Sequence, residues 1–324
     1  MTRNGLCGWV AMGLAGLSTM SAPALPDRAA ALATVAAAAL STPATSPEDL
    51  VLIPAGTFQM GDLLNEGGED ESPAHAVSLE AFLIGKFEVR KGEWDEIRRW
   101  AITRGYEFDY LGSGKGPNHP VHSINWFDAL KWCNARSERE GRPPCYSVDG
   151  AAYKTGQTVP ACDWTAKGYR LPTEAEWECA ARGGLAGRRF PWDDYTIQHT
   201  RANYYSLLDC DYDTSRTQGY HPLCNNNIMP FTAPVGSFAP NGFGLYDMAG
   251  NVWEWCWDEY DPAYYGVSSP AHPKGPSAGA VRRAERGGSW RNRAFSCRVS
   301  DRESDVASAA LNRVGFRIVL PQGP

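Results

Sequence analysis

The chain has 324 residues, 43% hydrophobic and 21% charged, a composition typical of a globular protein with enough length to bury a core. Its formal net charge of −6, without a run of lysines or arginines, argues against nucleic acid and anionic membrane surfaces as partners. The 33 glycines, 23 prolines and 12 tryptophans favour short elements joined by many turns.

Residues 1–24 have the three parts of an export signal. Arg3 supplies the positive charge, residues 5–20 supply the apolar stretch, and the Ala-Pro-Ala sequence at 22–24 supplies a small-residue cleavage site. An uncleaved membrane anchor is the alternative, but the apolar stretch is shorter than the roughly 20 residues that usually span a bilayer. Residues 25–48, rich in Ala, Ser, Thr and Pro, predict a flexible tether. We therefore expect the mature protein outside the cytoplasm, in the periplasm or secreted.

The cysteines permit disulfide bonds. Nine are present, and removal of Cys7 with the signal leaves eight, an even number in an exported chain. We expect Cys145 to pair with Cys162, and Cys210 with Cys224, because each pair brackets a loop rich in Gly, Asp or Asn. The connectivity stays open. No Cys-x-x-Cys motif occurs, so neither a thioredoxin-like site nor a zinc cluster is indicated.

Apolar patterns predict the first elements of the folded part. Residues 50–58 predict a strand, and strand-like alternation returns over 77–89 after an acidic loop. An apolar face with helical spacing predicts a helix over 91–104, and a second helix is expected from about Asn125 to Glu140. These elements predict a mixed helix and strand content for the first half of the chain.

Two histidines lie just before the second predicted helix. His119 and His122 are three residues apart, a spacing that two metal ligands can have. No third ligand lies nearby in the sequence, so a zinc or copper site would be incomplete. A structural role is therefore favoured for both.

Short motifs predict local structure further along the chain. Asp149-Gly150 is a typical turn of a β-hairpin. Thr173 and Glu176 have the spacing of a capping box, which predicts the start of a third helix. Arg170 precedes this helix and is well placed to pair with one of its carboxylates, a structural role.

Three tryptophans alternate in the stretch 241–259. Because side chains along a strand point to opposite faces in turn, a strand here would place Trp253, Trp255 and Trp257 on one face. Glu254 and the other intervening residues would lie on the second face. This stretch therefore predicts a strand with an aromatic face.

A candidate metal site precedes and overlaps this strand. Asp247 and Glu254 supply two carboxylates within reach of the carbonyls of Gly250 and Val252. Oxygen ligands of this kind suit a hard cation such as Ca²⁺. The alternative is a buried aromatic hairpin whose acids cap backbone groups.

Four segments together resemble the formylglycine-generating enzyme family, also called sulfatase-modifying factors. They are Arg-Leu-Pro-Thr-Glu-Ala-Glu-Trp-Glu at 170–178, the stretch 241–259, Gly-Gly-Ser-Trp at 287–290 and Val-Gly-Phe-Arg at 314–317. The resemblance covers residues from about 50 to 320, and its motifs are long and in order. It implies a fold low in regular secondary structure and related to C-type lectins.

The residues themselves predict the same class of fold. Few helices, many short strands and the absence of a repeat indicate one α+β domain over residues 49–324. We expect the first and last strands of this domain, at 50–58 and 314–320, to pair with each other.

The resemblance also implies two calcium sites. Asp247, Gly250, Val252 and Glu254 match one site of the family at every position. The other site falls on Asn203, Tyr204, Asn227 and Met229. Asn227 stands where the family has a carboxylate, so this second site loses charge and calcium affinity.

The family enzyme oxidises a cysteine of a sulfatase to formylglycine with O₂, using two cysteines that bind Cu(I). In the family these cysteines follow the Gly-Gly-Ser-aromatic turn by two and seven residues. Here the first position is Asn292 and the second is Cys297. Cu(I) prefers soft thiolate ligands, so an amide cannot replace one. We expect the copper site to lack a strong ligand, and efficient formylglycine formation to be absent.

Cys297 alone has three interpretations. It is half of a disulfide, with Cys256 as a candidate partner, or a small buried apolar residue, or a residual redox thiol. Three neighbouring arginines, Arg291, Arg293 and Arg298, can lower the pKa of a thiol. They can equally line a pocket for an anionic ligand, because guanidinium groups bind carboxylate and phosphate.

The resemblance places these residues in a cleft. Ser289 matches the family serine beside the substrate, but no histidine base stands at a useful spacing to make it a nucleophile. The catalytic candidates are therefore Cys297 and Ser289. The expected cleft residues are Trp253, Trp290, Arg291, Asn292 and Arg298.

Three functional hypotheses follow. The first is an exported paralogue, an oxidoreductase in the oxidative maturation of a peptide or natural product, as in siderophore chromophore assembly. The second is a non-catalytic, calcium-stabilised binding module for a protein or glycan. Exposed aromatics among Tyr204, Tyr205, Tyr264 and Tyr265 would favour it. The third is a formylglycine-generating oxidase, which Asn292 opposes. The expected partners are peptide, protein or small-molecule substrates.

Overall fold

The computed structural model describes residues 49–277 and 279–322. The predicted signal peptide and tether lie outside the described residues. None of the helices in the described part of the chain has the length and hydrophobicity that a membrane span requires.

Short helices and strands alternate with irregular segments, as the α+β prediction expects. The α-helices are α2 (Lys91–Ile102), α3 (Trp126–Arg139) and α4 (Glu174–Ala181), and the 3-10 helices are η2 (Glu69–Glu71), η3 (Tyr264–Gly266) and η4 (Ala294–Cys297). The strands of the first half are β1 (Leu50–Ile53), β2 (Gly56–Met60), β3 (His75–Leu79), β4 (Phe82–Gly85), β5 (Tyr146–Val148), β6 (Ala151–Ala152) and β7 (Ala161–Cys162). Those of the second half are β8 (Tyr205–Ser206), β9 (Gly219–Tyr220), β10 (Trp253–Glu259), β11 (Arg282–Arg286), β12 (Glu303–Val306), β13 (Val314–Gly315) and β14 (Val319–Pro321).

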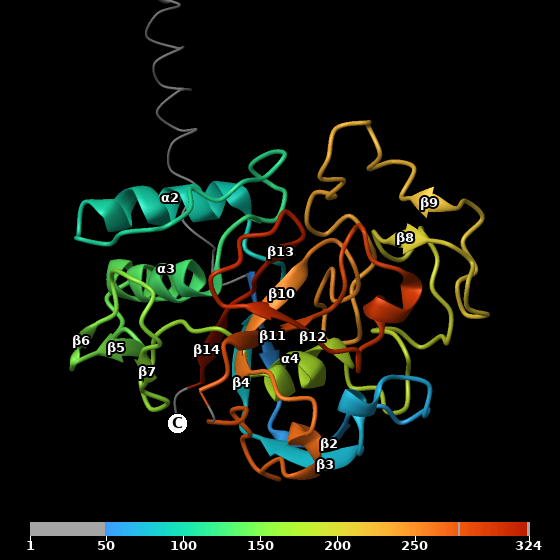
Figure 1. Ribbon diagram of the computed structural model, residues 1–324, viewed down its shortest axis with the longest axis horizontal. Coiled ribbons are helices and arrows are strands. Elements are labelled where there is room, and N and C mark those ends of the chain that lie inside the picture. The colour runs from blue at the N-terminus through green and yellow to red at the C-terminus, as the bar shows by residue number, and fades with distance from the viewer. Residues whose placement is uncertain (1–48, 278, 323–324) are drawn as a thin grey trace, which may run out of the picture. The chain divides into compact units, whose positions relative to one another are not determined.

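Strand β10 lies inside the largest sheet of the described residues, whose order is β12-β11-β10-β13. It pairs antiparallel with β11 and parallel with β13. Helix α4 packs beside β10 and β11, whereas α2 and α3 pack side by side (Figure 1). This arrangement covers the tryptophan-bearing strand on both faces and brings the turn at 287–290 next to it.

Helices α2 and α3 form for different reasons. Helix α2 is amphipathic and buries Trp94 and Ile97 on one face. Helix α3 is buried on nearly every side, and Asn125 caps its start by accepting a 2.7 Å hydrogen bond from the backbone N–H of Asp128. Trp94 and Trp132 lie parallel between the two helices, with their ring centroids 6.3 Å apart. Both predicted helices are confirmed to within two residues at each end.

The predicted capping box of α4 is present. The Thr173 hydroxyl accepts a hydrogen bond from the Glu176 N–H (3.2 Å), and the Glu176 carboxylate accepts one from the Thr173 N–H (2.8 Å). Arg170 donates two 2.6 Å hydrogen bonds to the two carboxylate oxygens of Glu176. The predicted hairpin turn is also present, because Asp149 and Gly150 have positive φ angles of 51° and 78° between β5 and β6.

The predicted pairing of the first and last strands was wrong. Strands β1 and β14 lie in the same three-stranded sheet, but β4 lies between them and pairs with both. The predicted first strand is also two strands, because Pro54 separates β1 from β2 and has no N–H to donate to a ladder.

The cysteines in the described part of the chain are unpaired. All eight that are described are free thiols, including the four for which we predicted pairing. Cys162 lies opposite Tyr146 in the β5–β7 ladder, so it is out of register with Cys145 by one residue. Cys256 and Cys297 lie in different hydrophobic clusters, so the third candidate disulfide is not formed either.

Candidate functional site

The site is built on strand β10. Trp253 and Trp255 are fully buried on one face, and Trp257 is partly buried, as the alternation predicts. The second face is buried too, with Glu254 at 1% exposure. The strand therefore holds both an aromatic layer and a buried carboxylate in fixed positions.

Two glycines shape the turn that faces this strand. Gly287 and Gly288 both have positive φ, at 98° and 77°, a conformation that other residues rarely adopt. A Cβ on Gly288 would lie 2.9 Å from the Cys297 sulfur and 2.7 Å from the Ser296 carbonyl oxygen. Glycine is therefore required for the turn to pack against η4, which carries Cys297.

Asn292 is fixed by hydrogen bonds to its side-chain oxygen. Oδ1 accepts from the Trp253 indole N–H at 3.0 Å and from the Ser289 hydroxyl. The backbone carbonyl of Asn292 accepts from the Tyr205 N–H at 2.8 Å. Because an indole N–H can only donate, the amide oxygen is the group that faces Trp253, and the amide nitrogen points away. Asn292 is partly exposed, and its amide nitrogen has no hydrogen-bond partner among the described residues.

Cys297 is sealed in the core. It is 0% exposed and belongs to a cluster with Phe190, Ile197 and Tyr204. Burial raises the pKa of the Cys297 thiol well above its ordinary value, and the carboxylate of Asp301 acts in the same direction. Of the three interpretations of this residue, the structure shows a small buried thiol.

The nearby arginines do not activate this thiol. Arg298 donates to both carboxylate oxygens of Glu71, at 2.7 and 2.6 Å, in a buried ion pair. Arg293 pairs with Asp209 at 2.9 Å, and Arg291 is exposed. The prediction that Arg298 lines the cleft is therefore wrong, because its charge is neutralised in the core. Arg291, beside Asn292, has no carboxylate partner among the described residues, and its guanidinium carbon lies 5.9 Å from the Trp290 ring centroid.

The residues present do not fit a two-thiolate Cu(I) centre. The first position holds an amide whose oxygen is already occupied by Trp253 and Ser289. The second holds a thiol that burial keeps protonated, whereas Cu(I) binds the thiolate.

Ser289 and Trp290 are less accessible than the resemblance implies. Ser289 is 0% exposed, and its hydroxyl is used by Asn292. Trp290 is 1% exposed and packs against the rings of Tyr220 and Phe231, with centroids 5.7 and 5.4 Å away. Both residues are therefore buried supports of the site, whereas Arg291 is exposed and Asn292 is partly exposed.

The first predicted calcium set contains a carboxylate oxygen without a partner. Asp247 is 7% exposed; its Oδ2 accepts from the Gly236 N–H at 2.7 Å, whereas its buried Oδ1 has no hydrogen bond. Burial raises the pKa of Asp247 to about 6. Glu254 is held by Arg317 at 2.6 Å through both oxygens and by the Trp177 indole at 2.7 Å.

Glu88 adds a third buried carboxylate that the sequence analysis missed. It accepts from the Asn251 amide at 2.9 Å and from the Val252 N–H at 3.2 Å. Burial, together with the charges of Asp247 and Glu254, raises the pKa of Glu88 well above its ordinary value. Its flanks, Phe87 and Val89, mark a buried segment, so an acid between two apolar residues was the signal available in the sequence.

This acidic region fits a divalent cation. Glu88, Asp247 and Glu254 face one guanidinium, that of Arg317, so the region carries a charge of −2 when all three acids are ionised. An unpartnered buried oxygen and excess negative charge are what Ca²⁺ would relieve. Among the described residues no three His, Cys, Asp or Glu side chains are arranged to hold a metal by themselves. The predicted set therefore also depends on the backbone carbonyls of Gly250 and Val252.

The second predicted calcium set does not fit. Asn203 is buried with an unpartnered Oδ1, but the Tyr204 carbonyl already accepts from His199 at 3.1 Å. Asn227 and Met229 lie on an exposed loop, with Met229 62% exposed. The set contains no carboxylate, which Ca²⁺ sites rely on for affinity.

Other candidates of the sequence analysis have structural roles. His119 and His122 each form a 3.0 Å hydrogen bond with a hydroxyl, and burial lowers the pKa of both. Tyr204 and Tyr265 are buried, at 0% and 2% exposure. Two of the four tyrosines whose exposure would favour a binding module are therefore buried.

Comparison with known proteins gives one consistent family. A model of the sulfatase-modifying factor enzyme 1-like domain matches residues 36–321. The formylglycine-generating enzyme of Streptomyces coelicolor is 35% identical over 314 residues, covering 87% of this chain and 93% of that protein. Treponema denticola variable protein 1 is similar in structure, with a TM-score of 0.66 at 29% identity over 84% of this chain and 95% of its own. PvdO from Pseudomonas aeruginosa follows, with a TM-score of 0.63 at 27% identity over 84% and 94%.

Proposed function

Because the chain belongs to the family of sulfatase-modifying factors, or formylglycine-generating enzymes, we propose that it takes part in the oxidative maturation of a peptide or natural product outside the cytoplasm, as in siderophore chromophore assembly. It does so without the two-thiolate copper centre of formylglycine formation. One observation carries the proposal: Asn292 occupies the first cysteine position, and buried Trp253 and Ser289 hold its oxygen. The amide is a fixed part of the site.

The amide nitrogen of Asn292 is the substrate-binding group in this proposal. It points away from Trp253 and has no partner among the described residues. A carbonyl oxygen of a peptide or amide natural product is the matching acceptor. Arg291 is exposed beside it and suits a substrate that also carries a negative charge. Cys297 takes no part in binding, because it is buried.

The oxidation balances as a loss of two electrons and two protons from the substrate. Dioxygen accepts the two electrons and the two protons and is released as hydrogen peroxide. Asn292 positions the substrate carbonyl and stays unchanged in this reaction.

The test compares a strain that lacks the gene with its parent. We expect the deletion strain to accumulate a peptide or natural product that is heavier by two hydrogen atoms, detected by mass spectrometry of the exported fraction. The purified protein should then convert it under air, with uptake of oxygen and release of peroxide. Asn292→Ala should raise the KM for this compound and leave the protein folded. Formylglycine formation in a Cys-x-Pro-x-Arg peptide would overturn the proposal.

A calcium-stabilised binding module is the second candidate. The observation that favours it is the sealed state of the site: Cys297 and Ser289 are both 0% exposed, so neither can accept a proton from a substrate. In that case the same compound, or a protein, binds near Asn292 without oxygen uptake. Binding that is equal in air and under argon, with no change of mass, would decide for the module and against maturation.

A further inference from the structure

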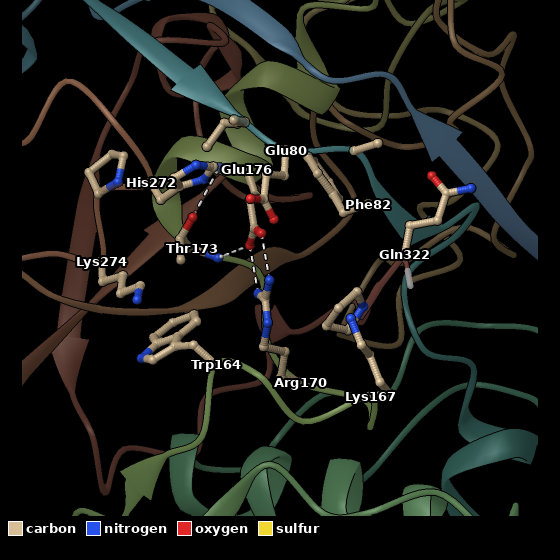
Figure 2. A pocket seen from close by; sticks show the side chains of 14 residues that line it. Glu80, Phe82, Trp164, Lys167, Arg170, Thr173, Glu176, His272, Lys274 and Gln322 are labelled. Atoms are coloured by element: carbon tan, nitrogen blue, oxygen red, sulfur yellow. Dashed lines mark hydrogen bonds and ion pairs between the residues drawn. The ribbon is translucent and has the colours of Figure 1, made fainter. Parts of the chain in front are cut away.

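A cavity of about 260 Å³ lies away from Asn292. It is enclosed by the corner between β3 and β4 (79–82), the segment 164–176, the loop 272–274 and the residues 321–322 (Figure 2). None of its lining residues belongs to the site around Asn292 or to the acidic region of Asp247. Four segments far apart in the sequence therefore meet at this pocket.

The base of the pocket is a preformed ion pair. Arg170 is 6% exposed and donates from its two terminal nitrogens to both oxygens of Glu176, each at 2.6 Å. Glu176 is also buried and helps to cap α4, so the pair cannot move easily. The Nε–H of Arg170 is buried and has no partner. A buried donor without an acceptor costs free energy.

The walls of the pocket carry unpaired positive charge. Lys274 places its ammonium 4.4 Å from the ring centroid of Trp164, and the Arg170 guanidinium carbon lies 5.1 Å from the same ring. In Figure 2, Lys274 and Trp164 lie on one side of Arg170, and Lys167 and Gln322 on the other. Neither Lys167 nor Lys274 has a carboxylate partner among the described residues.

The lining also contains one unpaired acid, Glu80. Because Arg170 and Glu176 neutralise each other, the two lysines against Glu80 leave the pocket with a net charge of +1. The protein as a whole carries −6, so this positive pocket stands out against its surroundings. An anion is therefore the favoured ligand.

We propose that this pocket binds a small ligand with a carboxylate and a flat or apolar body. Lys274, whose ammonium lies 4.4 Å from the Trp164 ring centroid, binds the carboxylate, and Trp164 packs against the body. Lys167, on the other side of Arg170, adds positive charge to the pocket. A carboxylate is favoured over a phosphate because the two terminal nitrogens of Arg170, which would bind a phosphate in bidentate geometry, already donate to Glu176. The volume is just below the range of about 300–1,000 Å³ typical of drug-sized ligands, so the ligand is of amino-acid size. A free aromatic acid and the C-terminal residue of a peptide both meet this description.

Calorimetric titration of the full protein at low ionic strength tests this proposal with two probes. N-acetylphenylalanine represents the end of a peptide, and benzoate represents a free aromatic acid. N-acetylphenylalaninamide is the neutral control, because it has the same ring without the carboxylate. We expect at least one carboxylate to bind with millimolar affinity and the amide not to bind. The carboxylate that binds more tightly shows whether the ligand is the end of a peptide or a free aromatic acid.

Lysine variants locate the binding. Lys274→Gln should weaken the binding of the carboxylate about tenfold, Lys167→Gln should weaken it less, and the double variant should abolish binding at millimolar concentration. Lys154→Gln is the matched control, since Lys154 pairs with Glu138 at 2.9 Å and does not line the pocket. Both pocket lysines are exposed, so the variants should keep the melting temperature of the parent. Equal binding of the amide, unchanged affinity in the double variant, or no binding of either carboxylate would overturn the proposal.

Discussion

Replacing Asn292 by alanine should destabilise the protein, because it removes an acceptor from two buried donors. The indole N–H of Trp253 and the hydroxyl of Ser289 both donate to the Asn292 Oδ1, and both donor residues are 0% exposed. A buried donor left without an acceptor costs about 1–3 kcal/mol. The Ser289 hydroxyl can rotate toward another acceptor, whereas the Trp253 N–H is fixed by its ring. We therefore expect Asn292→Ala to lower the free energy of unfolding by about 1–3 kcal/mol, mostly through Trp253.

Asn292→Asp is the matched comparison for this effect. Aspartate keeps an oxygen acceptor at the same position, so both donors stay satisfied and the loss should be less than half that of alanine. The free energies come from urea unfolding at pH 7 followed by tryptophan fluorescence. A loss below about 0.5 kcal/mol for Asn292→Ala, which is typical of an unimportant surface site, would refute the reasoning. Equal losses for the two variants would also refute it, because the acceptor would then not be what matters.

Three further predictions concern pH, backbone strain and calcium. Burial raises the pKa of Glu285 to about 8, so the contribution of this residue to stability is full below pH 4.5 and is lost as the pH rises through 8, by on the order of 5 kcal/mol. Glu285→Gln should remove this part of the pH dependence in urea unfolding across pH. Gly288→Ala should lower the free energy of unfolding by about 2 kcal/mol or more, because φ is +77° and the new Cβ would lie 2.7 Å from a carbonyl oxygen. Gly150→Ala is the control, because this glycine has a φ of +78° but no neighbouring atom near the new Cβ, and it should lower the free energy by only about 1 kcal/mol. Equal losses for the two variants would contradict the clash at Gly288. When calcium is present at a hundred times its Kd, its removal by EGTA should lower the melting temperature of the parent by the equivalent of about 2–3 kcal/mol. The melting temperature of Asp247→Asn should not change on addition of EGTA. An equal drop in both proteins would exclude this site.

Local motifs allowed much of the secondary structure to be predicted from the sequence. The capping box of Thr173 and Glu176 and the turn at Asp149-Gly150 depend on residues within a few positions of one another, so their chemistry is visible in the sequence. The pairing of β1 with β14 failed because strand neighbours are chosen by long-range packing, and β4 competes successfully for both.

Only part of the candidate site could be predicted, because many of its contacts join residues that are far apart in the sequence. The position of Asn292 followed from a short motif, but its partner Trp253 lies 39 residues away. Arg298 was placed in the cleft because it follows Cys297, whereas its partner Glu71 is 227 residues distant in the sequence. Glu88 was missed because it joins the acidic region from 164 residues before Val252. Contacts of such separation are set by the tertiary fold and leave no spacing signal.

Titration with Cu(I) against a competing chelator, in parallel for the parent and for Asn292→Cys, tests the central claim most directly. Oxygen uptake is measured in the same samples with a Cys-x-Pro-x-Arg peptide. Because the parent offers one buried thiol and one amide at the two positions, we predict no tight 1:1 copper binding and no oxygen uptake. Asn292→Cys should bind copper more tightly than the parent, since it restores a second thiol. Tight 1:1 binding by the parent, with turnover of the peptide, would contradict the account and make Cys297 catalytic.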